Sequence, residues 1–236
     1  LSLGAERTIL IKHAPFSYNL DKQLVSNKTG EIVKPDWVYF TSVAEDSIPY
    51  HHAIAKWIKE NNINMTFQPG SFQLFAGTEQ LKDVYEATNL FVCNVEEAEA
   101  LLKVDIANTT HTRHTPQFEA HVVDMMKQVA GFGPKMVAIS DGPDGTFAFD
   151  GEKSYYIPIY PDPKPPVERT GAGDSFASTF SSYLAQGYSF TDSLLRAPIN
   201  SMNVVQYVGA QEGLLTKEKL EEYLAAAPSD YKVKEL

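Results

Sequence analysis

The chain has 236 residues, of which 43% are hydrophobic and 21% charged, the composition of an ordinary globular protein. It has 20 Lys and Arg against 30 Asp and Glu, a formal net charge of −10, and this balance argues against a general nucleic-acid binder. The one cysteine, Cys93, excludes an intramolecular disulfide framework and a cysteine metal cluster. No apolar run approaches the roughly 18 residues of a membrane span, so we expect no membrane partner and a cytoplasmic location.

The first part of the chain alternates predicted strands and helices. Apolar and β-branched runs predict strands at 7–13, 36–42, 63–67, 90–93 and 135–140. Apolar residues at helical spacing predict helices at 47–61, 79–88, 96–103 and 116–130. Strands and helices that alternate in this way indicate βαβ units and a parallel sheet.

The pattern changes after residue 140. Residues 146–150 and 155–159 predict a β-hairpin, and four prolines within 161–166 predict an extended loop. The rest of the chain is predicted to be helical at 174–185, at 191–208 with a break near Pro198, and at 216–226. No internal repeat and no linker divides the sequence, so we expect residues 1–236 to form a single domain.

The segment 168–176 reads Glu-Arg-Thr-Gly-Ala-Gly-Asp-Ser-Phe and directly precedes a predicted helix. Gly171 and Gly173 allow the backbone to turn and a ligand to approach the N–H groups, which lie at the positive end of that helix. Asp174 falls at the mouth of this anion site. Its carboxylate either caps the helix or accepts a proton from a hydroxyl that attacks a phosphoryl group bound there.

Two more motifs follow predicted strands. Residues 140–145, Ser-Asp-Gly-Pro-Asp-Gly, form either a turn into the hairpin or a nucleotide loop at the carboxyl edge of a parallel sheet. Asn94 and Glu97 form either a helix start with acidic first-turn residues or oxygen ligands of hydrated Mg²⁺. We expect all three motifs to lie on one edge of one sheet.

Together these motifs resemble those of the ribokinase-like, phosphofructokinase-B-type family of carbohydrate kinases, over residues 7–215. The resemblance implies a three-layer αβα sandwich with a mostly parallel central sheet and part of a small β lid, here near residues 5–20. It implies ATP and Mg²⁺ as cofactors, and transfer of the γ-phosphoryl group to a hydroxyl of a sugar or nucleoside. A homodimer formed through the lid is also compatible with it.

The resemblance implies roles for particular residues. Asp174 is the implied general base, and the backbone of Gly171, Ala172 and Gly173 is the implied anion hole. The implied nucleotide-binding residues are Ser140, Asp141, Gly142, Gly145, Thr170, Asn200 and Gly209, and the implied Mg²⁺ residues are Asn94 and Glu97. Glu168 and Arg169 depart from the family's usual Asp-Thr, which argues against a monovalent cation as a cofactor.

The family's N-terminal region, which carries its acceptor-binding motifs, is not recognisable in this sequence. We therefore expect the chain to transfer phosphate poorly to a sugar, even with the donor half of the site intact. The alternative function is a catalytically impaired nucleotide-binding remnant of the same fold. A Rossmann dehydrogenase fits less well, because its glycine-rich turn should follow the first strand.

Overall fold

The computed structural model describes residues 2–3, 6–7, 18–20, 30, 34–43, 47–104, 113 and 115–236. Strand β1 (Ser2–Leu3) pairs antiparallel with strand β2 (Glu6–Arg7) in a separate two-stranded sheet. Most of the predicted lid at 5–20, and its strand at 7–13 beyond residue 7, lie outside the described residues.

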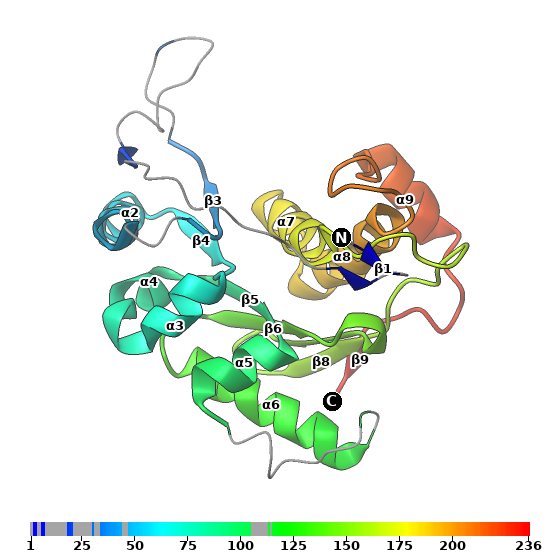
Figure 1. Cartoon of the computed structure of the whole chain (residues 1–236), viewed down its shortest axis with the longest axis horizontal. Helices are drawn as coiled ribbons and strands as arrows, with labels where there is room; N and C mark the ends of the chain where they lie inside the picture. The colour runs from blue at the N-terminus through cyan, green and yellow to red at the C-terminus, as the bar shows by residue number, and fades with distance from the viewer. Residues whose placement is uncertain are drawn as a thin grey trace.

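Within the described residues, the central sheet has seven strands in the order β3-β4-β5-β6-β7-β8-β9 (Figure 1). The strands are β3 (Trp37–Phe40), β4 (Asn64–Phe67), β5 (Leu90–Asn94), β6 (Met136–Ser140), β7 (Thr146–Phe149), β8 (Ser154–Ile157) and β9 (Lys234–Glu235). Strands β3 to β6 pair in parallel and the last three pair antiparallel, so five of the seven point the same way. The mostly parallel sheet is confirmed.

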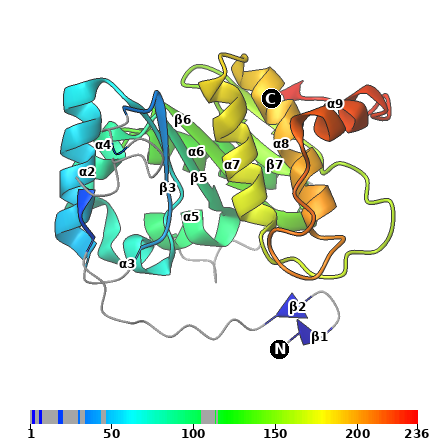
Figure 2. The same ribbon diagram turned by 90° about the horizontal axis from the view of Figure 1, so that it is seen from above.

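Helices cover both faces of this sheet, with α2 to α6 on one face and α7 to α9 on the other (Figures 1 and 2). The helices are α2 (Ile48–Asn61), α3 (Ser71–Gln80), α4 (Lys82–Ala87), α5 (Val95–Leu102), α6 (Pro116–Ala130), α7 (Ala172–Ala185), α8 (Phe190–Val204) and α9 (Lys217–Ala225). This arrangement confirms the three-layer αβα sandwich. Every helix in the described part of the chain is too short or too polar to cross a membrane.

Strand β5 shows how the sequence divides its side chains between the two layers. Phe91 and Cys93 pack with the α2–α6 layer, while Leu90 and Val92 pack with the α7–α9 layer. Both faces of a central parallel strand are buried, which explains why its sequence is apolar throughout rather than alternating. The first polar residue, Asn94, stands at the carboxyl end of the strand, where the chain leaves the core.

Two predictions differ from the structure, and one strand was not predicted. The helix predicted at 79–88 is the end of α3 followed by α4, and α3 was hidden by Pro69-Gly70 before it and by Gly77, whose φ of 80° kinks it. The break near Pro198 is wrong, because α8 runs through this proline and buries it. The proline supplies no backbone N–H, and it is buried together with its neighbours Ala197 and Ile199. Strand β9, only two residues long, gave no sequence signal.

Candidate active site

The amino end of α7 is built around a tight glycine turn. Gly171, the residue before the helix, has φ 80° and ψ 0°, and a Cβ on it would lie 2.9 Å from backbone and side-chain atoms of Ala210. Only glycine fits both the conformation and the space. Gly173 has no such conformational demand, and the nearest atom to a Cβ there would be Gln68 Nε2 at 3.8 Å. In this first turn the Ala172 N–H donates to the Arg169 carbonyl at 3.4 Å and the Ser175 N–H to the Gly171 carbonyl at 2.8 Å, which leaves the Gly173 and Asp174 N–H groups for a ligand.

A cavity of about 600 Å³ lies in front of these N–H groups, at the carboxyl ends of β5 and β6. Most of the predicted site residues meet along its wall. They are Asn94, Glu97, Ser140, Asp141, Gly142, Gly171, Ala172, Gly173 and Asp174. The expectation that the three motifs share one edge of the sheet is thereby met in the structure.

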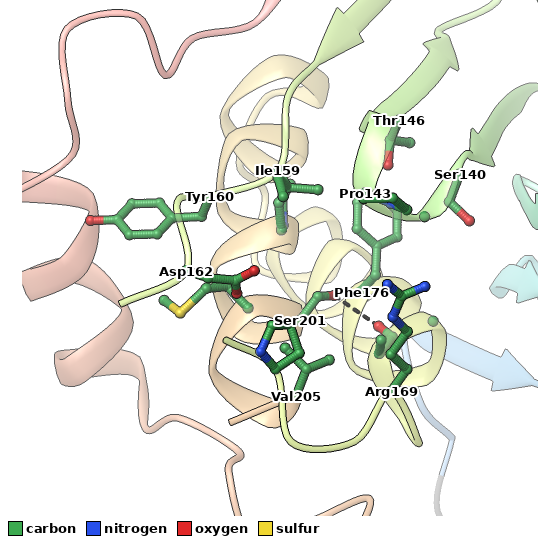
Figure 3. A pocket seen from close by; sticks show the side chains of 16 residues that line it. Ser140, Pro143, Thr146, Ile159, Tyr160, Asp162, Arg169, Phe176, Ser201 and Val205 are labelled. Atoms are coloured by element: carbon green, nitrogen blue, oxygen red, sulfur yellow. Dashed lines mark hydrogen bonds between the residues drawn. The ribbon is translucent and has the colours of Figure 1, made fainter. Parts of the chain in front are cut away.

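A second, apolar pocket of about 190 Å³ adjoins this cavity, and Arg169 and Phe176 line both (Figure 3). Ile159 and Tyr160, just after β8, form one side of it, and Ser201 of α8 with Val205 just after that helix form the other. The Tyr160 ring points away from the pocket toward α9 (Figure 3), where its hydroxyl donates a hydrogen bond to the Tyr223 carbonyl at 2.8 Å. The pocket thus offers a flat apolar ligand a place beside the anion site.

Two of the predicted nucleotide residues line neither cavity and support the fold instead. A Cβ on Gly145 would lie 2.5 Å from the Ile157 carbonyl oxygen, so this glycine serves the turn into the hairpin. Asn200 is buried; its Nδ2 donates to Thr179 Oγ1 at 2.8 Å and its Oδ1 accepts from the Leu215 N–H at 3.0 Å. Asn200 therefore joins α8 to its neighbours, and the next residue, Ser201, lines the apolar pocket in its place.

Thr170 and Gly209 also lie outside both cavity walls, and both contact Glu168. The Thr170 hydroxyl donates to Glu168 Oε1, and the Gly209 N–H donates to Glu168 Oε2 at 3.1 Å. The carboxylate thus joins the segment before α7 to the turn at Gly209, which packs on Gly171 through Ala210. Thr170, Gly209 and Glu168 therefore support the glycine turn at Gly171 without lining either cavity.

Asn94 and Glu97 form a capping box at the start of α5. Asn94 Oδ1 accepts from the Glu97 N–H at 2.7 Å, and Glu97 Oε2 accepts from the Asn94 N–H at 2.9 Å. The helix-start interpretation of this motif therefore holds. It does not displace the metal hypothesis, because the cap uses one of the two Glu97 carboxylate oxygens and both residues also line the cavity. Burial raises the pKa of Glu97.

Arg113 is a wall residue that the sequence did not single out. Its Nε donates to both carboxylate oxygens of Asp141, at 2.9 and 3.0 Å, and its NH2 group donates to Glu96 at 3.0 Å. Burial raises the pKa of Asp141, and the hydrogen bonds from Arg113 offset part of that effect. Because Arg113 reaches Asp141 from a distant part of the chain, no local motif could reveal the pair.

Gln68 and Tyr39 were also missed by the sequence motifs. Gln68, at the end of β4, donates from Nε2 to Asp174 Oδ1 at 3.2 Å, and the Tyr39 hydroxyl on β3 donates to Gln68 Oε1. Burial raises the pKa of Tyr39 to about 12, and the nearby Asp174 carboxylate adds to the effect. Tyr39 therefore remains a protonated donor at physiological pH.

The large cavity is strongly acidic. Five carboxylates line it, from Glu96, Glu97, Asp141, Asp144 and Asp174, against the two guanidinium groups of Arg113 and Arg169. An anionic ligand would need a counter-cation to overcome this excess of negative charge. Among the described residues no group of three or more His, Cys, Asp or Glu side chains forms a ready-made metal site. Mg²⁺ bound through water and one or two carboxylates needs no such group.

The chain is an α/β protein in which the amino end of α7 faces a cavity at the carboxyl edge of the sheet, next to an apolar pocket. Residues 2–217 match the sequence model of the pfkB family carbohydrate kinases, and the chain belongs to that family. The Bacillus subtilis (strain 168) ribokinase is 35% identical to this chain over 92 residues, which are 39% of this chain and 31% of that ribokinase.

Solved structures of ribokinases share the fold. The Cryptococcus neoformans ribokinase in complex with ADP has a TM-score of 0.65 and 20% identity, and the match covers 79% of this chain and 61% of that one. The Arabidopsis thaliana ribokinase complexed with ribose and ATP has a TM-score of 0.64 and 20% identity, covering 80% and 55%. The chain thus spans about a third of the length of its curated relative and little more than half of these structures.

Proposed function

We propose that this chain is an ATP-dependent kinase that transfers the γ-phosphoryl group to a hydroxyl of a sugar or nucleoside. The observation that carries this proposal is the amino end of α7, where the glycine turn, the free N–H groups and Asp174 face one cavity. Membership of a carbohydrate kinase family supports the reaction class. Because ATP is its donor, we also propose that the protein works in the cytoplasm.

Asp174 is the proposed general base. Its position in the first turn of α7 brings a carboxylate beside the N–H groups that would hold the phosphoryl group. It needs to accept the proton of the acceptor hydroxyl only as the new P–O bond forms. The backbone N–H groups around Gly171, Ala172 and Gly173 would stabilise the charge of the transferred group, and Arg169 adds positive charge on the shared wall.

The adjoining pocket is the proposed site for the adenine ring of the donor. Its apolar walls suit a flat base, and it shares Ser140 and Gly142 with the cavity for the phosphates. The ribokinase structures solved with ATP and with ADP support this choice of donor. Asn94 and Glu97 are the proposed residues for hydrated Mg²⁺, which would neutralise phosphate charge in a cavity rich in carboxylates.

A coupled assay for ADP release, run over a panel of sugars, sugar phosphates and nucleosides, tests the proposed function. Calorimetric titration with MgATP runs beside it, and Asp174→Asn is the matched variant because it keeps shape and removes the base. We expect ATP binding in both proteins, with a rate about 10²–10⁴-fold lower in the variant. Binding of ATP with no acceptor turned over would instead favour the nucleotide-binding remnant.

A further inference from the structure

Two parallel polar links join the edge strand β3 and its neighbour β4 to α7. In the outer link, Trp37 Nε1 donates to Thr66 Oγ1 at 2.9 Å, and Thr66 Oγ1 lies 2.7 Å from Ser181 Oγ. The inner link runs from Tyr39 through Gln68 to Asp174. Tyr39 stands two residues after Trp37, and Gln68, just past the end of β4, stands two residues after Thr66. In α7, Asp174 stands seven residues before Ser181.

The outer link is buried and has a structural explanation. Ser181 also donates to the Ala177 carbonyl at 2.6 Å, so every hydroxyl in this link has a partner deep between the sheet and α7. The inner link differs, because Gln68 and Asp174 both line the large cavity and Asp174 is exposed. An exposed hydrogen bond adds little to stability, so its place at the cavity wall calls for another explanation.

The donor directions in the inner link are fixed by chemistry. The Asp174 carboxylate only accepts hydrogen bonds, so the amide nitrogen of Gln68 must face it. The amide oxygen is then left to accept from the protonated Tyr39 phenol. The backbone is held as well, since the Gln68 N–H donates to the Phe40 carbonyl at 2.9 Å. Tyr39 and Asp174 thus hold the amide in one orientation from its two ends, and the amide holds one oxygen of the carboxylate.

We propose that Gln68, oriented by Tyr39, is the positioning residue for Asp174: it holds Oδ1 and leaves Oδ2 to take the proton of the acceptor hydroxyl. This inference rests on the proposed function. A positioned base must hold its productive geometry closely, and a displacement of about 1 Å in an active site can reduce the rate 10²-fold. The link also ties the base to β3 and to the end of β4, so this side of the sheet contributes to the site.

Kinetics of substitutions at Gln68 separate positioning from packing. Gln68→Met removes the donor but keeps the bulk, and we expect kcat to fall about 10–100-fold with little change in the KM for ATP. Gln68→Glu keeps the shape but places a second carboxylate against Asp174, so it should be slower than Gln68→Met. Packing alone predicts the opposite order, and a Gln68→Glu rate at or above that of Gln68→Met would overturn the proposal.

A double-mutant cycle tests the role of Tyr39. Tyr39→Phe should lower kcat less than Gln68→Met does, because the amide keeps its reach and loses only its fixed orientation. The double variant should be no slower than Gln68→Met alone, since both changes act on one link. Fully additive losses would contradict the relay. Ser181→Ala, which breaks only the outer link, is the control and should leave kcat unchanged while lowering stability.

A spectroscopic measurement on the full chain does not depend on turnover. The side-chain N–H resonances of Gln68 in ¹⁵N-labelled protein are assigned by their loss in Gln68→Met. Asp174→Asn and Tyr39→Phe should both shift them, and Ser181→Ala should not. Resonances unmoved by Asp174→Asn would refute the contact. If wild type binds ATP but phosphorylates no acceptor, the proposed function fails, and these resonances still decide whether Gln68 holds Asp174.

Discussion

Two glycines at the amino end of α7 allow the folding and the binding contributions of this turn to be separated. Gly171→Ala places an L-residue at φ 80° and brings its Cβ within 2.9 Å of Ala210. The left-handed conformation costs about 1–2 kcal/mol, and relieving the contact with backbone atoms costs a further ~1–3 kcal/mol. We therefore expect the free energy of unfolding to fall by about 2–5 kcal/mol in this variant.

Gly173→Ala, two residues away, should behave in the opposite way. Its Cβ meets nothing closer than Gln68 Nε2 at 3.8 Å, and alanine in place of glycine favours a helix by up to about 1 kcal/mol. The added methyl group projects where the donor phosphates are proposed to bind, so ATP affinity should fall while stability is kept or raised. Urea unfolding and calorimetric titration with MgATP measure the two effects. Equal stability of both variants, or unchanged ATP affinity in Gly173→Ala, would refute this account of the turn.

Two further predictions concern the cavity wall. Glu97→Gln should raise the Mg²⁺ concentration needed for half-maximal rate, while stability changes little, because glutamine can still complete the capping box with Asn94; an unchanged Mg²⁺ dependence would leave Glu97 a capping residue only. Arg113→Met should lower the free energy of unfolding by about 1–3 kcal/mol, because it leaves the buried Asp141 without its donor, and a second change, Asp141→Asn, should restore most of the loss in chemical denaturation.

The sequence predicted the parts of the site that depend on local chemistry. The glycine turn before a helix and the polar residues directly after buried strands each carry their own signal, and the parallel topology brings them together at one edge. Asn94 and Glu97 form a capping box that also presents both side chains to the cavity, so the metal interpretation stays a prediction beside the observed capping role. In this case the fold required no choice between them.

The residues that were missed act across elements. Gln68 reaches Asp174 over 106 positions of sequence and Arg113 reaches Asp141 over 28, and neither lies in a motif with a period or a spacing. The usual local effect of Pro198 predicts a break, whereas α8 continues through it and packs against α7 and the sheet. Tertiary contacts therefore decided the parts of the structure that local patterns did not.

A final prediction concerns the stability of the α2–α6 layer in acid. His51 is fully buried beside the ring of Phe40, at a centroid distance of 5.1 Å. Its Nδ1 lies 2.8 Å from the Ser47 carbonyl oxygen, which accepts, so Nδ1 carries the proton. Nε2 is then a bare nitrogen, buried with no hydrogen-bond partner. Protonation would place a charged N–H among aromatic rings, and burial accordingly lowers the pKa of His51 from its ordinary value of 6.5.

The sign of the effect follows from proton linkage. Between the lowered folded-state pKa and 6.5 the unfolded chain binds more protons than the folded one, so the free energy of unfolding rises with pH across that window. The stabilisation that comes from keeping His51 neutral is complete above pH 6.5 and is lost as the pH falls through the window. The free energy of unfolding falls by about 1.4 kcal/mol for each pH unit by which the folded-state pKa lies below 6.5. His51→Asn keeps a donor for the Ser47 carbonyl and removes the titration, so its urea-unfolding profile should be flatter there. The matched variant His52→Asn, at the exposed neighbour paired with Asp83, should keep the His51 step; a step that survives in His51→Asn would show that another group causes it.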